Sequence, residues 1–399
     1  MTKSVDKSIL FVVGTLEVGG TERHLALIST ALARRGWEVM VYSLAGDGPL
    51  RKTLIDGGVN VILAPVDRDG RPAALARRIF RLALASGYLF GVMLRRRPSI
   101  VHCFLPAAYL TAAPLAILAG IRVRIMSRRS LNRYQTKSRF LSKVERRLHR
   151  YMTAVLGNSR SVVSELAAEG VPPERLGLIY NGVDSTQSSS GVCRAVVRER
   201  LGLAKNDLVF VIVANLIPYK GHMDLVEALA VASSSILSQW KLLVVGRDDG
   251  VGPALRKRAD ELEIADRLLF LGSRPDVPDL LNASDIGLLT SHEEGFSNAI
   301  VEGMLAGLPM IVTDVGGNGE AVIDGVTGVV VPPHAPRDLS DAIVRLATDL
   351  DLRARYGESG RQRAETAFTL DACVSRYERL YRGLLDGELP GDMEELRIQ

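Results

Sequence analysis

Short apolar runs alternate with longer amphipathic stretches through the first half of the chain. The runs have the length and the branched residues of buried strands, while the stretches between them repeat apolar residues at helical spacing, as in 22–35 and 49–56. The predicted strands are 9–13, 38–42, 59–63, 100–103, 123–126, 154–156 and 176–179. Strands that alternate with helices predict βαβ units and a parallel sheet.

A short polar segment, Ser185–Gly191, interrupts this alternation, as expected for a linker. The pattern then resumes, with predicted strands at 208–213, 241–245, 267–271, 286–289 and 310–312. We therefore predict an α/β fold of two Rossmann-like parallel-sheet domains, 1–184 and 185–369, that face each other across a cleft. A further helix is predicted near 370–388.

Two carboxylates, Glu294 and Glu302, flank a Gly-Phe turn between a predicted strand and a predicted helix that starts near Asn298. Free backbone N–H groups and the positive dipole end make such a helix start an anion site. Glu302 lies about one turn further along, where a carboxylate can accept hydrogen bonds from a ribose diol. A glycine-dense loop, 314–320, follows the next strand, and ligands of parallel sheets bind at such strand ends. The combination predicts a site for a nucleotide-diphosphate sugar.

Composition narrows the class of protein. The chain has 399 residues, 47% of them hydrophobic, and a mean hydropathy of +0.13, which excludes a disordered protein. Three distant cysteines favour neither a disulfide framework nor a zinc site, and they fit a reducing compartment. The polar start resembles no secretory signal, and the apolar run 105–121 contains two prolines and is short for a membrane span. We expect a cytoplasmic protein without a spanning helix.

The net charge of +5 conceals an asymmetry. Residues 1–184 carry 28 basic and 13 acidic side chains, and residues 185–399 carry 22 and 32. The basic residues concentrate in Arg68–Arg97 and Arg122–Arg150. Such segments can bind an anionic membrane surface or an anionic acceptor, or they can simply be solvated helix faces. Nucleic acid is a weaker interpretation, because aromatic residues make up only 5% of the chain and no nucleic-acid motif is present.

Several motifs together resemble one family. The Glu294–Glu302 segment resembles the E-x7-E signature of the retaining GT-B glycosyltransferases of family 4, also called glycosyl transferases group 1. Four further segments resemble motifs of that family in the same order: Gly14–Glu22, Val101–Phe104, Tyr180–Asp184 and Val213–Gly221. The resemblance covers roughly residues 8 to 382. It implies that the first domain binds the acceptor, that the second binds the donor, and that the last helix packs back on the first domain.

The resemblance also implies roles for individual residues. Lys220 would neutralise the leaving diphosphate, Glu294 would hold hydroxyls of the transferred sugar, and His102 would contact the acceptor or that sugar. A buried, hydrogen-bonded role for His102 is an equal alternative. The donor-binding candidates are Gly19, Gly20, Asn215, Arg247, Arg274, Gly295, Phe296, Ser297, Asn298 and Glu302.

The chain departs from the family pattern at two places. Asn215 stands where an arginine is usual, five positions before Lys220, and Arg247 is a candidate to supply the missing charge. Ser127–Ser130 replaces a histidine or an acidic residue, so Arg128 and Arg129 become candidates for binding an anionic acceptor. The spacing around Gly19 and Gly20 is not that of a nicotinamide fingerprint.

The implied activity is that of a retaining, hexosyltransferase-type enzyme that uses a nucleotide sugar, no cofactor and no metal. In a front-face reaction, the departing phosphate oxygen accepts the proton of the acceptor, and the enzyme supplies positioning and charge. Two triplets match the D-x-D of metal-dependent transferases, Asp67–Asp69 and Asp349–Asp351, but neither falls near the predicted donor site. The expected acceptor is lipid-linked or a polysaccharide at the cytoplasmic membrane face. The alternatives are a nucleotide-sugar 2-epimerase and a non-catalytic sugar-nucleotide-binding relative.

Overall fold

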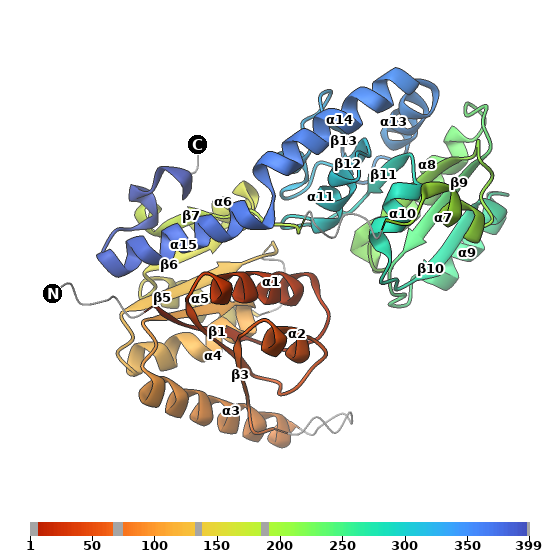
Figure 1. The fold of residues 1–399 in the computed structure, drawn as a ribbon. Helices are drawn as coiled ribbons and strands as arrows, with labels where there is room; N and C mark the ends of the chain where they lie inside the picture. The colour runs from red at the N-terminus through yellow and green to blue at the C-terminus, as the bar shows by residue number, and fades with distance from the viewer. Residues whose placement is uncertain (1–6, 67–74, 132–137, 185–190, 397–399) are drawn as a thin grey trace. The chain divides into compact units, whose positions relative to one another are not determined.

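A computed structural model describes residues 7–66, 75–131, 138–184 and 191–396. The chain divides into two compact units (Figure 1). The first comprises Met1–Gly182 together with Leu370–Gln399, and the second comprises Val183–Thr369. The division falls at 182/183, whereas the sequence predicts a boundary at 184/185. The predicted linker lies mostly in 185–190, outside the described residues.

Unit 1 is built on a seven-stranded parallel sheet with the order β3-β2-β1-β4-β5-β6-β7. Its strands are β1 Ser8–Val13, β2 Glu38–Ser43, β3 Asn60–Leu63, β4 Ile100–Phe104, β5 Val123–Arg128, β6 Ala154–Gly157 and β7 Leu176–Leu178. Its helices are α1 Gly20–Arg34, α2 Leu50–Asp56, α3 Leu75–Arg96, α4 Leu105–Leu118, α5 Arg139–His149, α6 Arg160–Ala168 and α15 Leu370–Asp386, with short 3-10 turns η2 Pro173–Arg175, η6 Pro390–Asp392 and η7 Glu394–Leu396.

The central strands of unit 1 are buried on both faces, which explains their continuous apolar sequences. Side chains of β1 alternate between two cores: Phe11 packs with α1 and α15 on one face, and Leu10 packs with α3 and α4 on the other. Helix α15 joins the first of these cores through Tyr377 and Tyr381. The last long helix of the chain therefore completes the core of the first unit.

Unit 2 repeats the architecture with six parallel strands in the order β10-β9-β8-β11-β12-β13. The strands are β8 Leu208–Val213, β9 Trp240–Val245, β10 Leu268–Gly272, β11 Ile286–Leu289, β12 Met310–Thr313 and β13 Gly328–Val331. The helices are α7 Arg194–Arg200, α8 His222–Ala232, α9 Gly252–Glu261, α10 Val277–Ala283, α11 Asn298–Leu305, α12 Asn318–Ala321, α13 Pro336–Thr348 and α14 Leu350–Ala367, with 3-10 turns η4 Pro218–Lys220 and η5 Ala265–Arg267. The predicted pair of Rossmann-like parallel sheets is confirmed.

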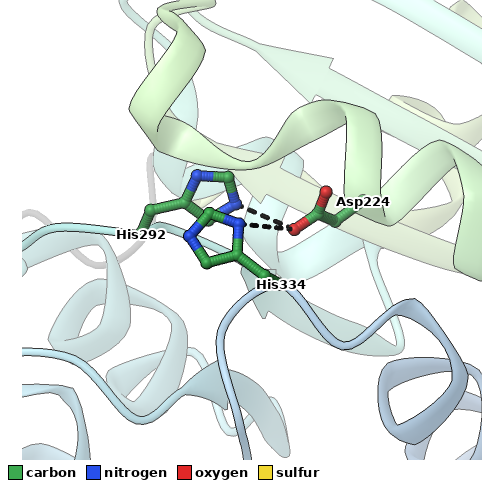
Figure 2. A group of neighbouring side chains, drawn as sticks. All are labelled: Asp224, His292 and His334. Atoms are coloured by element: carbon green, nitrogen blue, oxygen red, sulfur yellow. Dashed lines mark hydrogen bonds and ion pairs between the residues drawn. The ribbon is translucent and has the colours of Figure 1, made fainter.

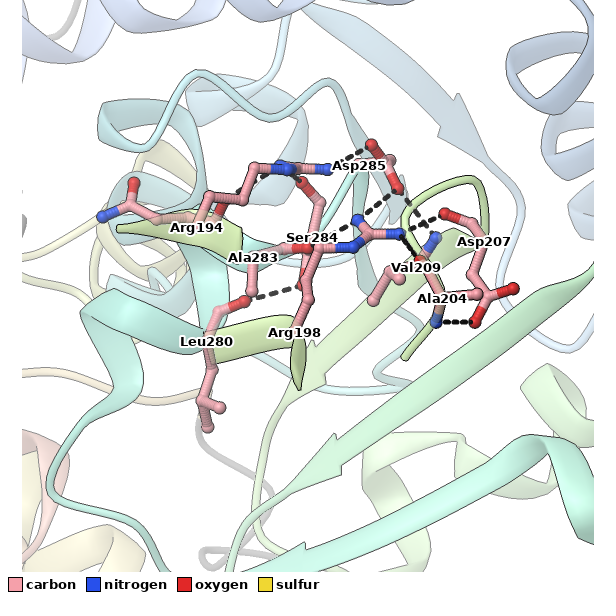
Figure 3. A network of polar contacts seen from close by, with 10 residues as sticks. Arg194, Arg198, Ala204, Asp207, Val209, Leu280, Ala283, Ser284 and Asp285 are labelled. Atoms are coloured by element: carbon pink, nitrogen blue, oxygen red, sulfur yellow. Dashed lines mark hydrogen bonds and ion pairs between the residues drawn. The ribbon is translucent and has the colours of Figure 1, made fainter. Parts of the chain in front are cut away.

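An arginine network holds the first helix of unit 2 in place (Figure 3). The buried Arg198 of α7 donates to the carbonyl oxygens of Ala204, Asp207 and Ala283. Asp285, just before β11, pairs with Arg198 at 3.5 Å and accepts from the backbone N–H of Val209. One guanidinium thus joins the loop before β8 to the end of α10, and it satisfies the buried carbonyl of Ala283.

The apolar run at 105–121 forms α4, which carries Pro114 inside it and buries alanines and Tyr109 against the sheet. Within the described residues, no helix is both long enough and apolar enough to cross a membrane.

We predict that Arg198→Met lowers the free energy of unfolding of unit 2 by about 3 kcal/mol, because the carbonyl groups of Asp207 and Ala283 lose this donor and the ion pair with Asp285 is broken. The chain has two tryptophans, Trp37 in unit 1 and Trp240 in unit 2. Denaturation followed by fluorescence in a Trp37→Phe background therefore reports on unit 2. Arg200→Met on the same helix is the matched control, since Arg200 is exposed and its loss should change stability by less than about 0.5 kcal/mol. Equal effects of the two substitutions would contradict this prediction.

Candidate functional site

Lys220 and Glu294 lie 74 positions apart in the sequence and form an ion pair in unit 2. The Lys220 Nζ lies 2.5 Å from the Glu294 Oε1, and the two side chains are only 17% and 11% exposed. Ser291 donates its hydroxyl to the same carboxylate oxygen at 2.8 Å. The structure therefore brings together two residues for which the sequence predicts catalytic roles.

Sheet topology explains why these residues meet. Lys220 follows β8 and Glu294 follows β11, and these strands are neighbours at the point where the strand order reverses. Successive connections leave such a point toward opposite sides of the sheet, which opens a crevice at the carboxyl ends of the strands. The pair stands at this edge of unit 2.

A glycine allows the Lys220 turn to approach β11 closely. Gly221 has a φ of +66°, and a Cβ there would lie 1.9 Å from the carbonyl oxygen of Thr290. Thr290 in turn donates its hydroxyl to the Gly221 carbonyl at 3.0 Å. A side chain at position 221 would push the Lys220 turn away from β11 and separate Lys220 from Glu294.

The glycine-rich loop after β12 packs against the backbone of the Glu294 segment. Gly317 donates its N–H to the carbonyl oxygen of Gly295 at 2.7 Å, and a Cβ on Gly316 would lie 2.0 Å from the carbonyl oxygen of Glu294. Asn318 donates its side-chain amide to the Thr313 carbonyl at the end of β12. The loop thus fixes the turn that leads into α11.

The start of α11 has the features of an anion site. Ser297 is the N-cap residue, and no side chain caps the helix there. Asn298 and Glu302 are half-buried on this helix, one turn apart. Phe296, expected to line the donor site, is buried, and its ring packs on Phe368 with a centroid separation of 5.1 Å. This contact joins the turn before α11 to the end of α14.

Asn215 contacts the backbone of Arg247 and not its guanidinium. The Asn215 Oδ1 accepts from the backbone N–H of Arg247 at 3.0 Å, whereas the Arg247 guanidinium is 64% exposed and binds Asp249 at 2.7 Å. Arg274 pairs similarly with Asp276 at 2.6 Å. Each candidate arginine thus forms an ion pair with the aspartate two positions after it. Among the described residues, the ion pair of Lys220 is with Glu294 and not with either of these arginine–aspartate pairs.

His102 lies in the core of unit 1 with no exposed surface. Its Nδ1 contacts the Tyr381 hydroxyl at 2.8 Å, and its Nε2 contacts the Ser127 hydroxyl at 2.7 Å. Both ring nitrogens are therefore occupied by the protein, which favours the buried, hydrogen-bonded alternative over contact with a substrate. Burial, and secondarily the charge of Arg129, hold the pKa of His102 well below its ordinary value.

Arg128 corrects the expectation of an acceptor-binding guanidinium. It is fully buried and donates to Glu145 at 2.6 Å and to both carboxylate oxygens of Glu169 at 2.6 and 2.8 Å. His149 lies 3.2 Å from the same Glu169 and is stacked on Tyr109. The two carboxylates bind Arg128 inside unit 1, so it acts in the fold.

Arg129 remains near polar groups that follow β1 and β7. Its guanidinium donates to Asn181, and Glu22 interacts with it electrostatically. Burial raises the pKa of Glu22 and lowers that of Arg129. The Glu22 carboxylate folds back over Gly19, where an added Cβ would lie 2.4 Å from its Oε2. Gly19, Gly20 and Glu22 follow β1, which neighbours β4 at the reversal of strand order in unit 1.

The sequence did not predict the residues that form hydrogen bonds with His102 and Arg128. Nothing in the local pattern marks Tyr381 or Glu169 as partners of His102 and Arg128, because 279 and 41 positions separate them. Asn181 lies in the Tyr180–Asp184 motif, and only that resemblance pointed to it.

The described residues include two groups that could hold a metal ion, Asp224–His292–His334 and Glu145–His149–Glu169. The second encloses the Arg128 guanidinium, which already neutralises its carboxylates. Of the D-x-D triplets, Asp349 caps the start of α14 by accepting from Leu352 N–H, and Asp67–Asp69 lies outside the described residues.

Two doubly wound parallel sheets, with an ion pair at the switch point of the second, define a protein of the GT-B class. Residues 18–187 match the family model Glycosyltransferase Family 4, and residues 194–363 match the family model Glycosyl transferases group 1. The chain belongs to the family 4 GT-B glycosyltransferases.

Individual relatives are distant. A D-inositol 3-phosphate glycosyltransferase of Gordonia bronchialis is 29% identical, over 94% of this chain and 87% of the relative. An Escherichia coli UDP-Gal:alpha-D-GlcNAc-diphosphoundecaprenol alpha-1,3-galactosyltransferase is 28% identical, over 53% of this chain and 55% of the relative. Anabaena HepE, solved in complex with UDP, superposes with a TM-score of 0.81 at 24% identity and covers 94% of this chain and 100% of the neighbour.

We predict that acidification below about pH 6.5 destabilises unit 1. The pKa values of His24 and His102 are lowered well below normal, so the unfolded state binds more protons below the ordinary histidine pKa. This contribution to stability is therefore full above that pH and is lost progressively as the pH falls below it, toward the lowered pKa values of the folded state. The measurement is the free energy of unfolding of unit 1 at several pH values, followed by Trp37 fluorescence in a Trp240→Phe background. His102→Asn should cost about 1–3 kcal/mol at pH 7 and make the pH dependence shallower than in the Trp240→Phe parent. An unchanged slope would contradict the assignment of His102 as a neutral core residue.

Proposed function

We propose that this chain is a retaining glycosyltransferase that moves a sugar from a nucleotide-diphosphate donor to a lipid-linked or glycan acceptor. The observation that carries the proposal is the half-buried Lys220–Glu294 ion pair at the switch point of unit 2. A cation and a carboxylate with limited solvent access provide a partner for the diphosphate and a partner for sugar hydroxyls at one place.

Donor binding would exchange the partners of this pair. The donor diphosphate competes with Glu294 for the Lys220 ammonium, and the start of α11 offers backbone N–H groups to the same phosphates. Once released, the Glu294 carboxylate accepts hydrogen bonds from hydroxyls of the transferred sugar. Glu302, one turn into α11, accepts hydrogen bonds from the ribose diol. HepE of Anabaena, which shares the fold, is solved with UDP-glucose, and this supports the same class of ligand here.

The proposed chemistry is a front-face substitution with retention. The bond between the anomeric carbon and the phosphate oxygen breaks, the acceptor oxygen bonds to that carbon on the same face, and the departing phosphate oxygen takes the acceptor proton. Lys220 stabilises the charge that develops on the phosphate, so the transfer proceeds without a catalytic metal ion. Holding the two substrates together supplies the rest of the rate enhancement.

Surface features of unit 1 support an acceptor at a membrane. Helix α3 exposes the large apolar side chains Ile79, Phe80, Leu82 and Tyr88 among its arginines. Helix α5 exposes Phe140 at 74% together with four cations, Arg139, Lys143, Arg146 and Arg147. Apolar side chains among cations fit the interface of an anionic bilayer. The diphosphoundecaprenol acceptor in the name of the Escherichia coli relative supports this acceptor class.

Two alternatives are distinguished from this proposal by experiment, and one of them has an observation of its own. Asn215 replaces a cation of the phosphate clamp and is engaged with the Arg247 backbone, which favours a non-catalytic relative that binds nucleotide without turnover. A 2-epimerase would use the same fold without an acceptor. Isomerised sugar nucleotide in the absence of any acceptor would identify the epimerase.

We predict that Lys220→Ala, Glu294→Ala and Glu302→Ala each remove most turnover while the fold is retained. Each substitution removes a charge that binds or stabilises the donor, and losing one such group typically costs about 10²–10³-fold. The measurement is release of nucleoside diphosphate, with circular dichroism as the check on folding.

Lys257→Ala is the matched control for these substitutions, because Lys257 is 81% exposed on α9 of the same unit. It should leave turnover unchanged. Activity within about threefold of wild type in Lys220→Ala or Glu302→Ala would contradict the site assignment.

We also predict that reversing the four exposed cations of α5 to glutamate weakens binding to anionic vesicles. Each basic residue near an anionic surface contributes about 1 kcal/mol, so the combined loss should remove sedimentation with phosphatidylserine-containing vesicles at physiological salt. Neutral phosphatidylcholine vesicles should bind both proteins weakly.

The control reverses four exposed cations of unit 2, Arg200, Lys205, Lys257 and Arg337, which changes the net charge equally. If both variants lose binding alike, net charge rather than the α5 surface is responsible. If the α5 variant sediments like wild type, α5 is a solvated helix face.

A further inference from the structure

Asp224, His292 and His334 converge at the carboxyl edge of the sheet in unit 2 (Figure 2). The Nε2 of His292 lies 2.8 Å from the Oδ2 of Asp224, and the Nδ1 of His334 lies 4.0 Å from the same oxygen. The two imidazole rings face each other with centroids 3.7 Å apart. One ligand-type atom from each residue lies within 4.8 Å of the other two.

Backbone contacts fix two of these side chains before any ligand binds. Asp224 stands in the first turn of α8. His292 donates its backbone N–H to the Tyr219 carbonyl at 2.7 Å, in the turn that precedes α8. Gly221 leaves room for the ring, since a Cβ there would lie 3.1 Å from the His292 Nε2. These contacts hold the imidazole against the start of α8.

The third side chain is held in an unusual backbone conformation. His334 connects β13 to α13 and has a φ of +59°, in the left-handed region that residues with a Cβ rarely adopt. Helix α13 packs on α8 through the common core of Leu225, Leu229, Leu339 and Ile343, which brings His334 to Asp224. A residue kept in a sparsely populated conformation indicates a constraint that the surrounding structure or a ligand imposes.

We propose that Asp224, His292 and His334 form a binding site for a divalent transition-metal ion of the zinc type. Two imidazole nitrogens and a carboxylate oxygen are ligands that Zn²⁺ accepts, whereas Mg²⁺ prefers oxygen alone. Zn–N and Zn–O bonds of about 2.0–2.2 Å place tetrahedral ligand atoms about 3.3–3.6 Å apart. The observed separations of 2.8 and 4.0 Å lie on either side of that range, so small side-chain rotations suffice.

The ion would join three segments that are distant in sequence. It would connect the start of α8, the turn that carries both His292 and Glu294, and the loop before α13. The site is separate from the Lys220–Glu294 ion pair, which has its own contacts. The ion therefore has a structural role, and the metal-independence expected for sugar transfer concerns different residues. Partial exposure of the three side chains leaves a coordination position for water.

The test is a titration of the full chain with Zn²⁺, prepared without a polyhistidine tag and in a Cys193→Ser background, because Cys193 is an exposed thiol. Equilibrium dialysis with metal analysis, in the presence of excess Mg²⁺, should give about one Zn²⁺ per chain. Binding should raise the temperature of unfolding reported by Trp240 in unit 2. His334→Gly and Asp224→Asn should each weaken the affinity by at least about tenfold, since losing even a residue that merely orients a metal ligand costs about 10–100-fold.

His334→Gly separates loss of a ligand from loss of the fold. Glycine suits a φ of +59°, so the metal-free variant should unfold at the same temperature as the parent or higher. Asp338→Asn removes an exposed carboxylate four positions away and should bind Zn²⁺ like the parent. Absence of saturable binding in the parent, or parental affinity in His334→Gly and Asp224→Asn, would overturn the proposal. The readout is binding and unfolding rather than turnover, so it is independent of the proposed function.

Discussion

The approach of the β8–α8 turn to β11 is the constraint on which the candidate site depends. Gly221 permits it by adopting a positive φ and by leaving no side chain between its backbone and Thr290. The approach places Lys220 within an ion-pair distance of Glu294. Because both side chains are mostly shielded from water, their attraction is stronger than that of a surface pair, and each charge is costly to leave without a partner. In the proposed function, the donor diphosphate would replace the carboxylate as the partner of Lys220.

Both units contain a reversal of strand order in the parallel sheet, but different side chains follow the strands at that point. In each sheet the strand order reverses beside the first strand, at β1 and β4 in unit 1 and at β8 and β11 in unit 2. Glycines follow β1, and a lysine follows β8. His102 on β4 and Arg129 just after β5 are buried polar residues of unit 1, and both form hydrogen bonds with other residues of that unit. Lys220 and Glu294, which follow the two strands at the reversal in unit 2, bond to each other, and the proposed donor site rests on this pair.

The sequence predicted the alternation of strands and helices well, because burial on both faces of a parallel sheet leaves long apolar runs. The pattern around the strand at 286–289 pointed to Glu294, whereas only the resemblance to the family motif pointed to Lys220. The sequence could not establish whether the side chains of His102 and Arg128 bind substrate or are buried with partners from the same unit. Their partners come from α15, α5 and the end of α6, and only tertiary packing brings Tyr381, Glu145 and Glu169 to them. The same limit applies to Phe296, whose ring is buried because Phe368 meets it.

The most direct test of the account is release of nucleoside diphosphate by the wild-type chain across a panel of sugar nucleotides, with EDTA present and a cell lipid extract as acceptor. The account predicts release from one donor that requires the lipid extract and continues in EDTA. The product should retain the anomeric configuration of the donor. Binding of a donor without release, in the presence of both lipid and soluble glycan acceptors, would contradict catalysis and favour a protein that only binds the sugar nucleotide.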